Sequence, residues 1–158
     1  MRLKLIELCM VKPEALQRYS LFGGIEKEQI EAILHVMQHE KFQPDEIIIA
    51  EGNANDKIYF IIEGQVSVTK QDFQLSRFNE GEAFGEMEVL DVMPATATIK
   101  SLTPVTTMSI SNKGLREIYK IDIKTFSLLI MNLARDLSRR LRRMDEKLAL
   151  SESKPFLL

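Results

Sequence analysis

The residues best able to do chemistry lie in one short segment in the second half of the chain. In chain order they are Phe84, Gly85, Glu86, Met87, Ala95 and Thr96, with Pro94 before the last two. We interpret the segment as a turn on Gly85, a short helix and then a strand that starts at the proline. Free N–H groups and the dipole at the start of a helix attract negative charge. The segment therefore predicts a site in which Gly85 faces an anion.

The remaining reactive side chains do not combine into a catalytic or metal centre. Glu31, His35 and His39 are spaced four residues apart in a predicted helix, a pattern that can indicate metal ligands. A tetrahedral site needs ligands from elsewhere, and the chain has only two histidines and a single cysteine, Cys9. No serine or cysteine stands in a nucleophile motif beside a base. We expect no metal ion and no enzymatic activity.

Length and composition describe a globular protein of the cell interior. The 158 residues suffice for one domain with an extension. A single cysteine cannot form an internal disulfide and fits a reducing compartment. The apolar N-terminus is interrupted by Lys4 and Glu7, which argues against a signal peptide, and no run has the length of a membrane span. These features predict a cytoplasmic protein without a membrane partner.

The elements that must position the segment follow from the hydrophobic pattern. Residues 26–38 carry an apolar stripe at helical spacing, after a helix start at Pro13. Short β-branched runs then alternate with turns, at residues 47–49, 58–62, 65–69, 96–100 and 105–110. No crossover helices separate these runs, so the strands are expected to be antiparallel. The predicted fold is α+β, with a jelly-roll-like antiparallel β-roll behind N-terminal helices.

The C-terminal part returns to helical spacing. Ser111 is the expected cap of a helix over residues 112–119, and Asp122 of a long helix that reaches Ala149. Its apolar positions form a narrow, coiled-coil-like seam: Phe126, Ile130, Leu133, Leu137, Leu141, Met144 and Leu148. The helix either folds back along its own roll or pairs with the same helix of a second copy. The length of the seam favours a homodimer.

A change in net charge along the chain supports a division into a domain, a long helix and a tail. Residues 1–120 are net acidic, whereas the rest is net basic. We expect a domain over residues 1–120, a dimerisation helix over 121–150 and a tail over 151–158. Acidic side chains interleave with Arg139, Arg140, Arg142 and Arg143, so we interpret these arginines as the solvated face of the long helix.

Several motifs, taken in order, resemble the cyclic-nucleotide-binding domain family, of the catabolite-activator (CRP/FNR) kind. The resemblance covers about residues 16–148. It is carried by Leu21-Phe22-Gly23-Gly24-Ile25, by the acidic-Gly turn and following strand over residues 51–66, by Gly81, and by Phe84-Gly85-Glu86. The last motif is similar to the phosphate-binding cassette of that family, and residues 84–96 are called the cassette below. The resemblance implies the same roll and long terminal helix.

The resemblance also implies roles for single residues. Amides near Gly85 would face a cyclic phosphate, and Glu86 would accept a hydrogen bond from the ribose. Thr96 matches a small or hydroxyl position, and Met144 and Asp145 fall where base-contacting residues occur. A purely structural role for Glu86, as a carboxylate at the helix start, is equally open.

Ala95 departs from the family, because an arginine that pairs with the phosphate usually stands there. A bidentate arginine–phosphate contact contributes about 3–6 kcal/mol, or roughly a hundredfold to ten-thousandfold in affinity. Arg77, Lys70 or Lys100 could compensate only by reaching into the site. The departure therefore predicts that any binding of cAMP or cGMP is weak.

The function predicted from these observations is a non-enzymatic regulatory or sensor protein of this family. It would act as a homodimer that responds to a small-molecule ligand or a protein partner. No specific DNA binding is expected of this chain, because it stops before a helix-turn-helix could form. If the sequence is a piece of a longer protein, that domain would lie in the missing part. The alternatives are a dimeric protein-interaction module with a vestigial pocket, or a sensor of a different small molecule.

Overall fold

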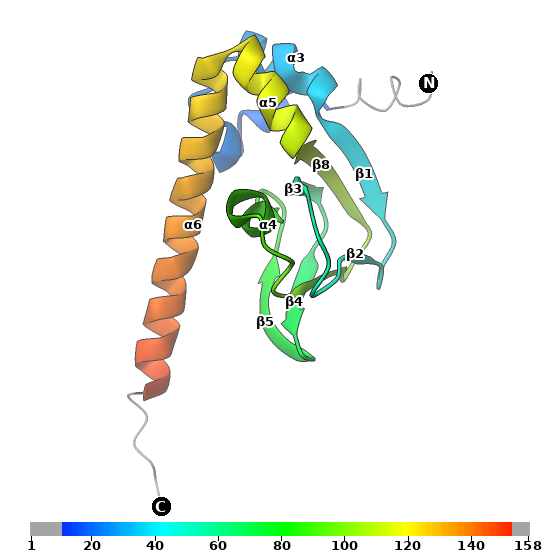
Figure 1. Cartoon of the computed structure of the whole chain (residues 1–158), viewed down its shortest axis with the longest axis vertical. Coiled ribbons are helices and arrows are strands. Elements are labelled where there is room, and N and C mark those ends of the chain that lie inside the picture. Colours follow the sequence, from blue (N-terminus) through cyan, green and yellow to red (C-terminus); the bar gives the residue numbers. More distant parts are fainter. Residues whose placement is uncertain (1–10, 153–158) are drawn as a thin grey trace, which may run out of the picture.

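The computed structural model describes residues 11–152 as two antiparallel sheets with helices at one end and one long helix alongside (Figure 1). The helices are α2 (Pro13–Leu16), α3 (Lys27–Ile33), α4 (Glu86–Asp91), α5 (Asn112–Ile121) and α6 (Ile123–Glu152), with 3₁₀ turns η1 (Ser20–Phe22) and η2 (Leu34–Val36). The strands are β1 (Gln38–Phe42), β2 (Ile47–Ile49), β3 (Lys57–Glu63), β4 (Val66–Lys70), β5 (Phe73–Phe78), β6 (Ala83–Phe84), β7 (Thr98–Ser101) and β8 (Val105–Ser111).

The two sheets form a roll, which confirms the predicted fold class. One sheet has the order β1-β8-β3-β6 and the other β2-β7-β4-β5, and every pairing is antiparallel. One apolar cluster, centred on Phe22 and Phe60, joins the sheets to the helices. A second, with Tyr59, Ile61 and Phe84, fills the roll itself. The strand that carries Phe60 and Tyr59 therefore faces both cores with alternate side chains.

The predicted helix over residues 26–38 is wrong in its second half. Helix α3 ends at Ile33, η2 follows, and β1 begins at Gln38 and pairs with β8. Tertiary pairing with a long central strand outweighs the local helical spacing here. His39 therefore lies on a strand, so Glu31, His35 and His39 do not share a helical face. Among the described residues no cluster of metal-ligating side chains is found.

The strands around the cassette also differ in detail from the expectation. Strand β7 begins at Thr98, so Pro94 and Ala95 lie in an irregular segment rather than at a strand start. Strand β5 was not expected, and it pairs with β4 after a turn in which Gln71 and Asp72 have positive φ. A left-handed turn of this kind matches the twist of a hairpin.

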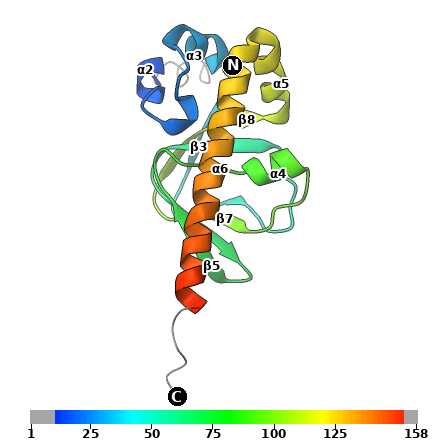
Figure 2. The same cartoon turned by 90° about the vertical axis from the view of Figure 1, so that its left-hand side faces the viewer.

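Two predicted helix caps are present, Ser111 at the start of α5 and Asp122 at the start of α6. The Ser111 hydroxyl accepts a hydrogen bond from Gly114 N at 3.1 Å. The Asp122 carboxylate accepts from Lys124 N at 3.1 Å and Thr125 N at 3.2 Å, and its hydrogen bond from the Thr125 hydroxyl lowers its pKa. Helix α6 then packs against α5 and η1 and runs the height of the molecule (Figure 2).

The amide of Asn132 fixes α6 on η1. This side chain is buried and donates to Leu21 O at 3.0 Å and to Gly23 O at 2.8 Å. Within residues 11–152, no helix combines the length and the apolar character that a bilayer crossing requires.

Candidate functional site

The turn near the start of the cassette is made by a glycine in the left-handed region, which L side chains rarely adopt. Gly85 has φ +79° and is the N-cap of α4. A Cβ built there would lie 2.6 Å from Lys57 O and 2.9 Å from Asn55 Nδ2. The turn therefore needs glycine for two reasons, its left-handed backbone and its close approach to β3.

Asn55 joins the cassette to the start of β3. Its amide nitrogen donates to Gly85 O at 3.1 Å and to Lys57 O at 2.7 Å, and its oxygen accepts from Lys57 N at 3.2 Å. Phe84 stacks on Tyr59 of β3, with ring centroids 5.0 Å apart and an angle of 9° between the ring planes. Burial raises the pKa of Tyr59 to about 12, so its phenol stays neutral. The start of the cassette is thus a rigid part of the roll.

Glu86 forms the link between the cassette and the long helix. Its side chain is 4% exposed, and its Oε1 accepts from Arg140 Nη1 at 3.0 Å. Arg140 also donates to Ala83 O, and its guanidinium lies 4.3 Å from the ring centre of Phe78. We call Glu86, Arg140 and Phe78 the clamp.

The clamp holds a carboxylate in a nearly water-free setting. Burial raises the pKa of Glu86, and the charge of Arg140 offsets part of that rise. Gly85 is the N-cap of α4, and Glu86 lies in the first turn, where a hydrogen bond from its own backbone amide also lowers its pKa. The same carboxylate contacts α6, so a place at the helix start and a link to the long helix are combined in one side chain. The interpretation of Arg140 as part of a solvated face is wrong, because its side chain is only 16% exposed and binds Glu86. Its position in a run of arginines, far from the cassette in sequence, hid this contact.

The position of the missing arginine is part of the core. Ala95 is buried in the apolar cluster that also contains Ile49, Ile61 and Phe84. Its backbone bonds to the turn before β3, since Ala95 N donates to Asn53 O at 2.8 Å and Gly52 N donates to Ala95 O at 2.7 Å. Thr96 next to it is exposed, as is half of Met87 on α4. The structure thus brings Phe84, Gly85 and Glu86 together and leaves Met87 and Thr96 at the surface.

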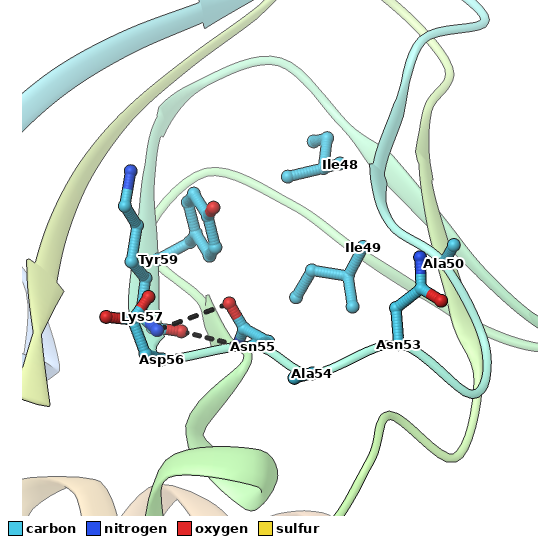
Figure 3. A pocket seen from close by; sticks show the side chains of 9 residues that line it. All are labelled: Ile48, Ile49, Ala50, Asn53, Ala54, Asn55, Asp56, Lys57 and Tyr59. Carbon is cyan, nitrogen blue, oxygen red and sulfur yellow. Dashed lines mark hydrogen bonds between the residues drawn. The ribbon is translucent and has the colours of Figure 1, made fainter.

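A pocket of about 260 Å³ opens beside the cassette, between the β2–β3 loop and Tyr59 (Figure 3). It is lined by Ile48, Ile49, Ala50, Asn53, Ala54, Asn55, Asp56, Lys57 and Tyr59. Its one cation, Lys57, is paired with Glu40 at 2.9 Å. Amide and carboxylate groups therefore dominate its polar lining, which does not favour a phosphate.

None of the basic residues considered as substitutes lines this pocket. Lys100 pairs with Asp45 at 2.9 Å, and Arg77 and Lys70 are exposed on the β4–β5 hairpin. Met144 and Asp145 lie beyond Arg140 on the part of α6 where residues 141–150 are all exposed. In this single chain, the structure does not bring Met144 or Asp145 to the pocket.

Helix α6 presents two different faces. Thr125, Leu129, Asn132 and Leu133 are buried against the chain's own domain, and Arg140 continues that stripe toward the cassette. At about 100° per residue, the predicted seam lies on an adjacent face that shares Leu133 with this stripe. Its first four members are buried or half-buried, namely Phe126, Ile130, Leu133 and Leu137. Leu141, Met144 and Leu148 are 60%, 66% and 62% exposed.

Comparison with known proteins gives this geometry a family. The sequence profile of the cyclic nucleotide-binding domain matches residues 39–122. A CRP-like cAMP-activated global transcriptional regulator of Mycobacterium tuberculosis is 30% identical over 141 residues, which are 86% of this chain and 61% of the relative. A cAMP-dependent protein kinase type II regulatory subunit of Drosophila melanogaster is 31% identical over 135 residues, covering 85% of this chain and 32% of the relative. This chain thus spans less than two thirds of either relative.

Solved structures show the same fold. A cyclic nucleotide-binding domain from Methylobacillus flagellatus has a TM-score of 0.80 at 22% identity, covering 98% of this chain and 88% of that one. The Thermus thermophilus catabolite activator protein has a TM-score of 0.72 at 25% identity, covering 84% and 63%. With the profile match across the roll, the cassette and α5, these comparisons show that the chain belongs to the cyclic nucleotide-binding domain family, of the CRP/FNR-like kind.

Proposed function

We propose that this chain is a non-enzymatic regulatory domain of the cytoplasm in which α6 responds to the state of the cassette. One observation carries the proposal: the buried Glu86 carboxylate is bound by Arg140 of α6. Anything that draws Glu86 into another contact also removes the partner of Arg140. The position of the helix then depends on the occupancy of the cassette.

The coupling takes the form of a population shift. With the clamp closed, Arg140 is held by Glu86, Ala83 O and the Phe78 ring at the point where α6 leaves the domain. A ligand or partner that binds better to the open clamp shifts the chain toward a state with a freer helix, by as much as its affinities for the two states differ. Opening the clamp is costly where Arg140 or Glu86 stays buried without its partner. The closed and open states therefore differ clearly in free energy.

Cyclic nucleotides are weak ligands in this proposal. The ribose-binding carboxylate expected from the family is already paired with Arg140, and Ala95 sits in an apolar cluster. A cyclic phosphate placed there would have no cation opposite it. Calorimetric titration with cAMP and cGMP is expected to show no saturation at micromolar ligand.

A pair of variants tests the reason for this weakness. Ala95→Arg is expected to raise cyclic-nucleotide affinity by about a hundredfold or more. Thr96→Arg is the matched control, because it adds the same charge at the exposed neighbour and should change the affinity little. Micromolar binding by the unmodified chain would contradict the proposal.

The second half of α6 supports a homodimer through residues 121–150. Leu141, Met144 and Leu148 form a stripe at coiled-coil spacing, on the part of the seam that the chain's own residues leave exposed. A partner helix of the same kind would cover it without displacing the clamp. Sedimentation of the chain is expected to show a dimer that Leu148→Glu weakens and Lys147→Glu does not.

A second candidate is a docking module that binds no small molecule. The observation in its favour is that Glu86, the carboxylate expected to bind a ribose, is held by Arg140 within the chain. The titration above separates the two candidates, together with a search for ligands that suit the amide-lined pocket. Saturable binding of any such ligand that also frees α6 would favour the sensor.

A further inference from the structure

A second pocket lies outside the roll, between α6 and the turn that joins β5 to β6. Its volume is about 380 Å³, within the range of sites for small molecules. It is lined by Ser20, Gly81, Glu82, Asp136, Arg139, Arg140 and Arg143. This pocket shares no lining residue with the one beside the cassette. It is therefore a second candidate binding site, distinct from the pocket beside the cassette.

The guanidinium groups of this pocket have N–H donors left over for an anion. Of the three arginines, Arg140 is held by Glu86 and Arg139 by Asp136, and both carboxylates that line the pocket already have donors. Asp136 accepts from Ser20 Oγ at 3.2 Å and pairs with Arg139, and Glu82 accepts from Asn79 N at 2.9 Å. Arg143 has no ion-pair partner in the part of the chain that the structure describes. The N–H donors of Arg143, and those of Arg139 that do not contact Asp136, remain available to a ligand.

The pocket stays open in the proposed dimer. Asp136, Arg140 and Arg143 follow the same spacing as the buried Asn132 and form the domain-facing side of α6. At about 100° per residue, Arg139 and Arg143 lie at least about 100° around the helix from Leu141, Met144 and Leu148. A helix seated on the seam therefore leaves these two arginines accessible.

We propose that this pocket binds a compact anion that carries phosphate groups, with Arg139 and Arg143 as its direct contacts. A guanidinium offers parallel N–H donors that match two phosphate oxygens. The walls come from η1, from the β5–β6 turn and from α6, so a bound anion connects all three. It holds α6 on the outside of the roll, next to Arg140, and so strengthens the closed clamp.

Pyrophosphate is the probe for this site. Calorimetric titration of the full chain at moderate salt is expected to give saturable binding with a dissociation constant of about 1 mM or below. Arg143→Gln should weaken it by at least about tenfold, the effect of one lost charge-assisted contact. Arg142→Gln is the matched control, since it removes the same charge from an exposed neighbour outside the pocket and should change the affinity by less than about twofold.

Hydrogen exchange locates the bound probe. Pyrophosphate should slow the exchange of amides around residues 79–82 and 132–143 in the unmodified chain, and not in Arg143→Gln. Absence of saturation at about 10 mM, equal weakening by both variants, or protection at the cassette pocket instead would each overturn the proposal. None of these results bears on the weak cyclic-nucleotide binding proposed above, which is measured at the other pocket.

Discussion

The two halves of α6 differ in where their partners lie. The first half is covered by the chain itself, through buried Leu129, Asn132 and Leu133. The second half, from residue 141 onward, is exposed and yet keeps a regular apolar stripe. Arg140 stands at the boundary, as the last residue of the helix with substantial cover. The cassette thus holds α6 at the point where intrachain contacts end and contacts with a partner are expected to begin.

The largest expected difference in stability is between the same leucine-to-alanine change in the first and in the second half of α6. Leu133→Ala removes a side chain that is 3% exposed and is expected to lower the free energy of unfolding by about 3–4 kcal/mol. Leu148→Ala makes the same chemical change at a 62% exposed position, where about 0.5 kcal/mol or less is expected for the monomer. Urea unfolding at low protein concentration measures both. Similar losses would show that the second half also packs on its own domain.

A glycine pair tests whether the cassette turn is held by close approach. Gly85→Ala should lower the free energy of unfolding by about 2–3 kcal/mol. The new Cβ would clash with the backbone of Lys57, and alanine would also be strained by the left-handed φ. Gly52→Ala is the control, with φ +83° and no atom within 4 Å of its Cβ, and should cost about 1–2 kcal/mol. Urea unfolding of both variants gives the comparison. Equal costs would mean that backbone conformation alone requires Gly85.

The pH dependence of stability tests the burial of Glu86 at the boundary. Its pKa is raised in the folded state, so the folded state binds the proton more tightly than the unfolded state. The free energy of unfolding should therefore lose a contribution as the pH rises from 4.5, the ordinary pKa, through the raised value. Glu86→Gln cannot titrate and should lack this loss of stability with rising pH. Parallel pH profiles for the two proteins would show that Glu86 is solvated.

The sequence could predict the parts of the fold that have strong local signals. The β-branched runs located β2, β3, β4 and β8, and Ser111 and Asp122 are the observed helix caps. Strand β1 was missed because Gln38–Phe42 is largely polar and follows a helical stripe, and only its pairing with β8 makes it a strand. Strands β5 and β6 are likewise defined by their neighbours.

The candidate site was predictable only in its local part. Phe84, Gly85 and Glu86 could be singled out because they are adjacent in a motif. The partner of Glu86 could not, since Arg140 has three arginine neighbours within a few residues. The one sequence signal for a domain-facing Arg140 was that it continues the helical spacing of Thr125, Leu129, Asn132 and Asp136. That stripe is less apolar than the seam and was therefore overlooked.

A double-mutant cycle between Glu86 and Arg140 tests the central claim most directly. The unmodified chain, Glu86→Gln, Arg140→Gln and the double variant are compared by urea unfolding at neutral pH. Because the pair is largely buried, a coupling free energy of at least about 1 kcal/mol is predicted. A coupling near zero would contradict the account, since the cassette would then have no energetic hold on α6.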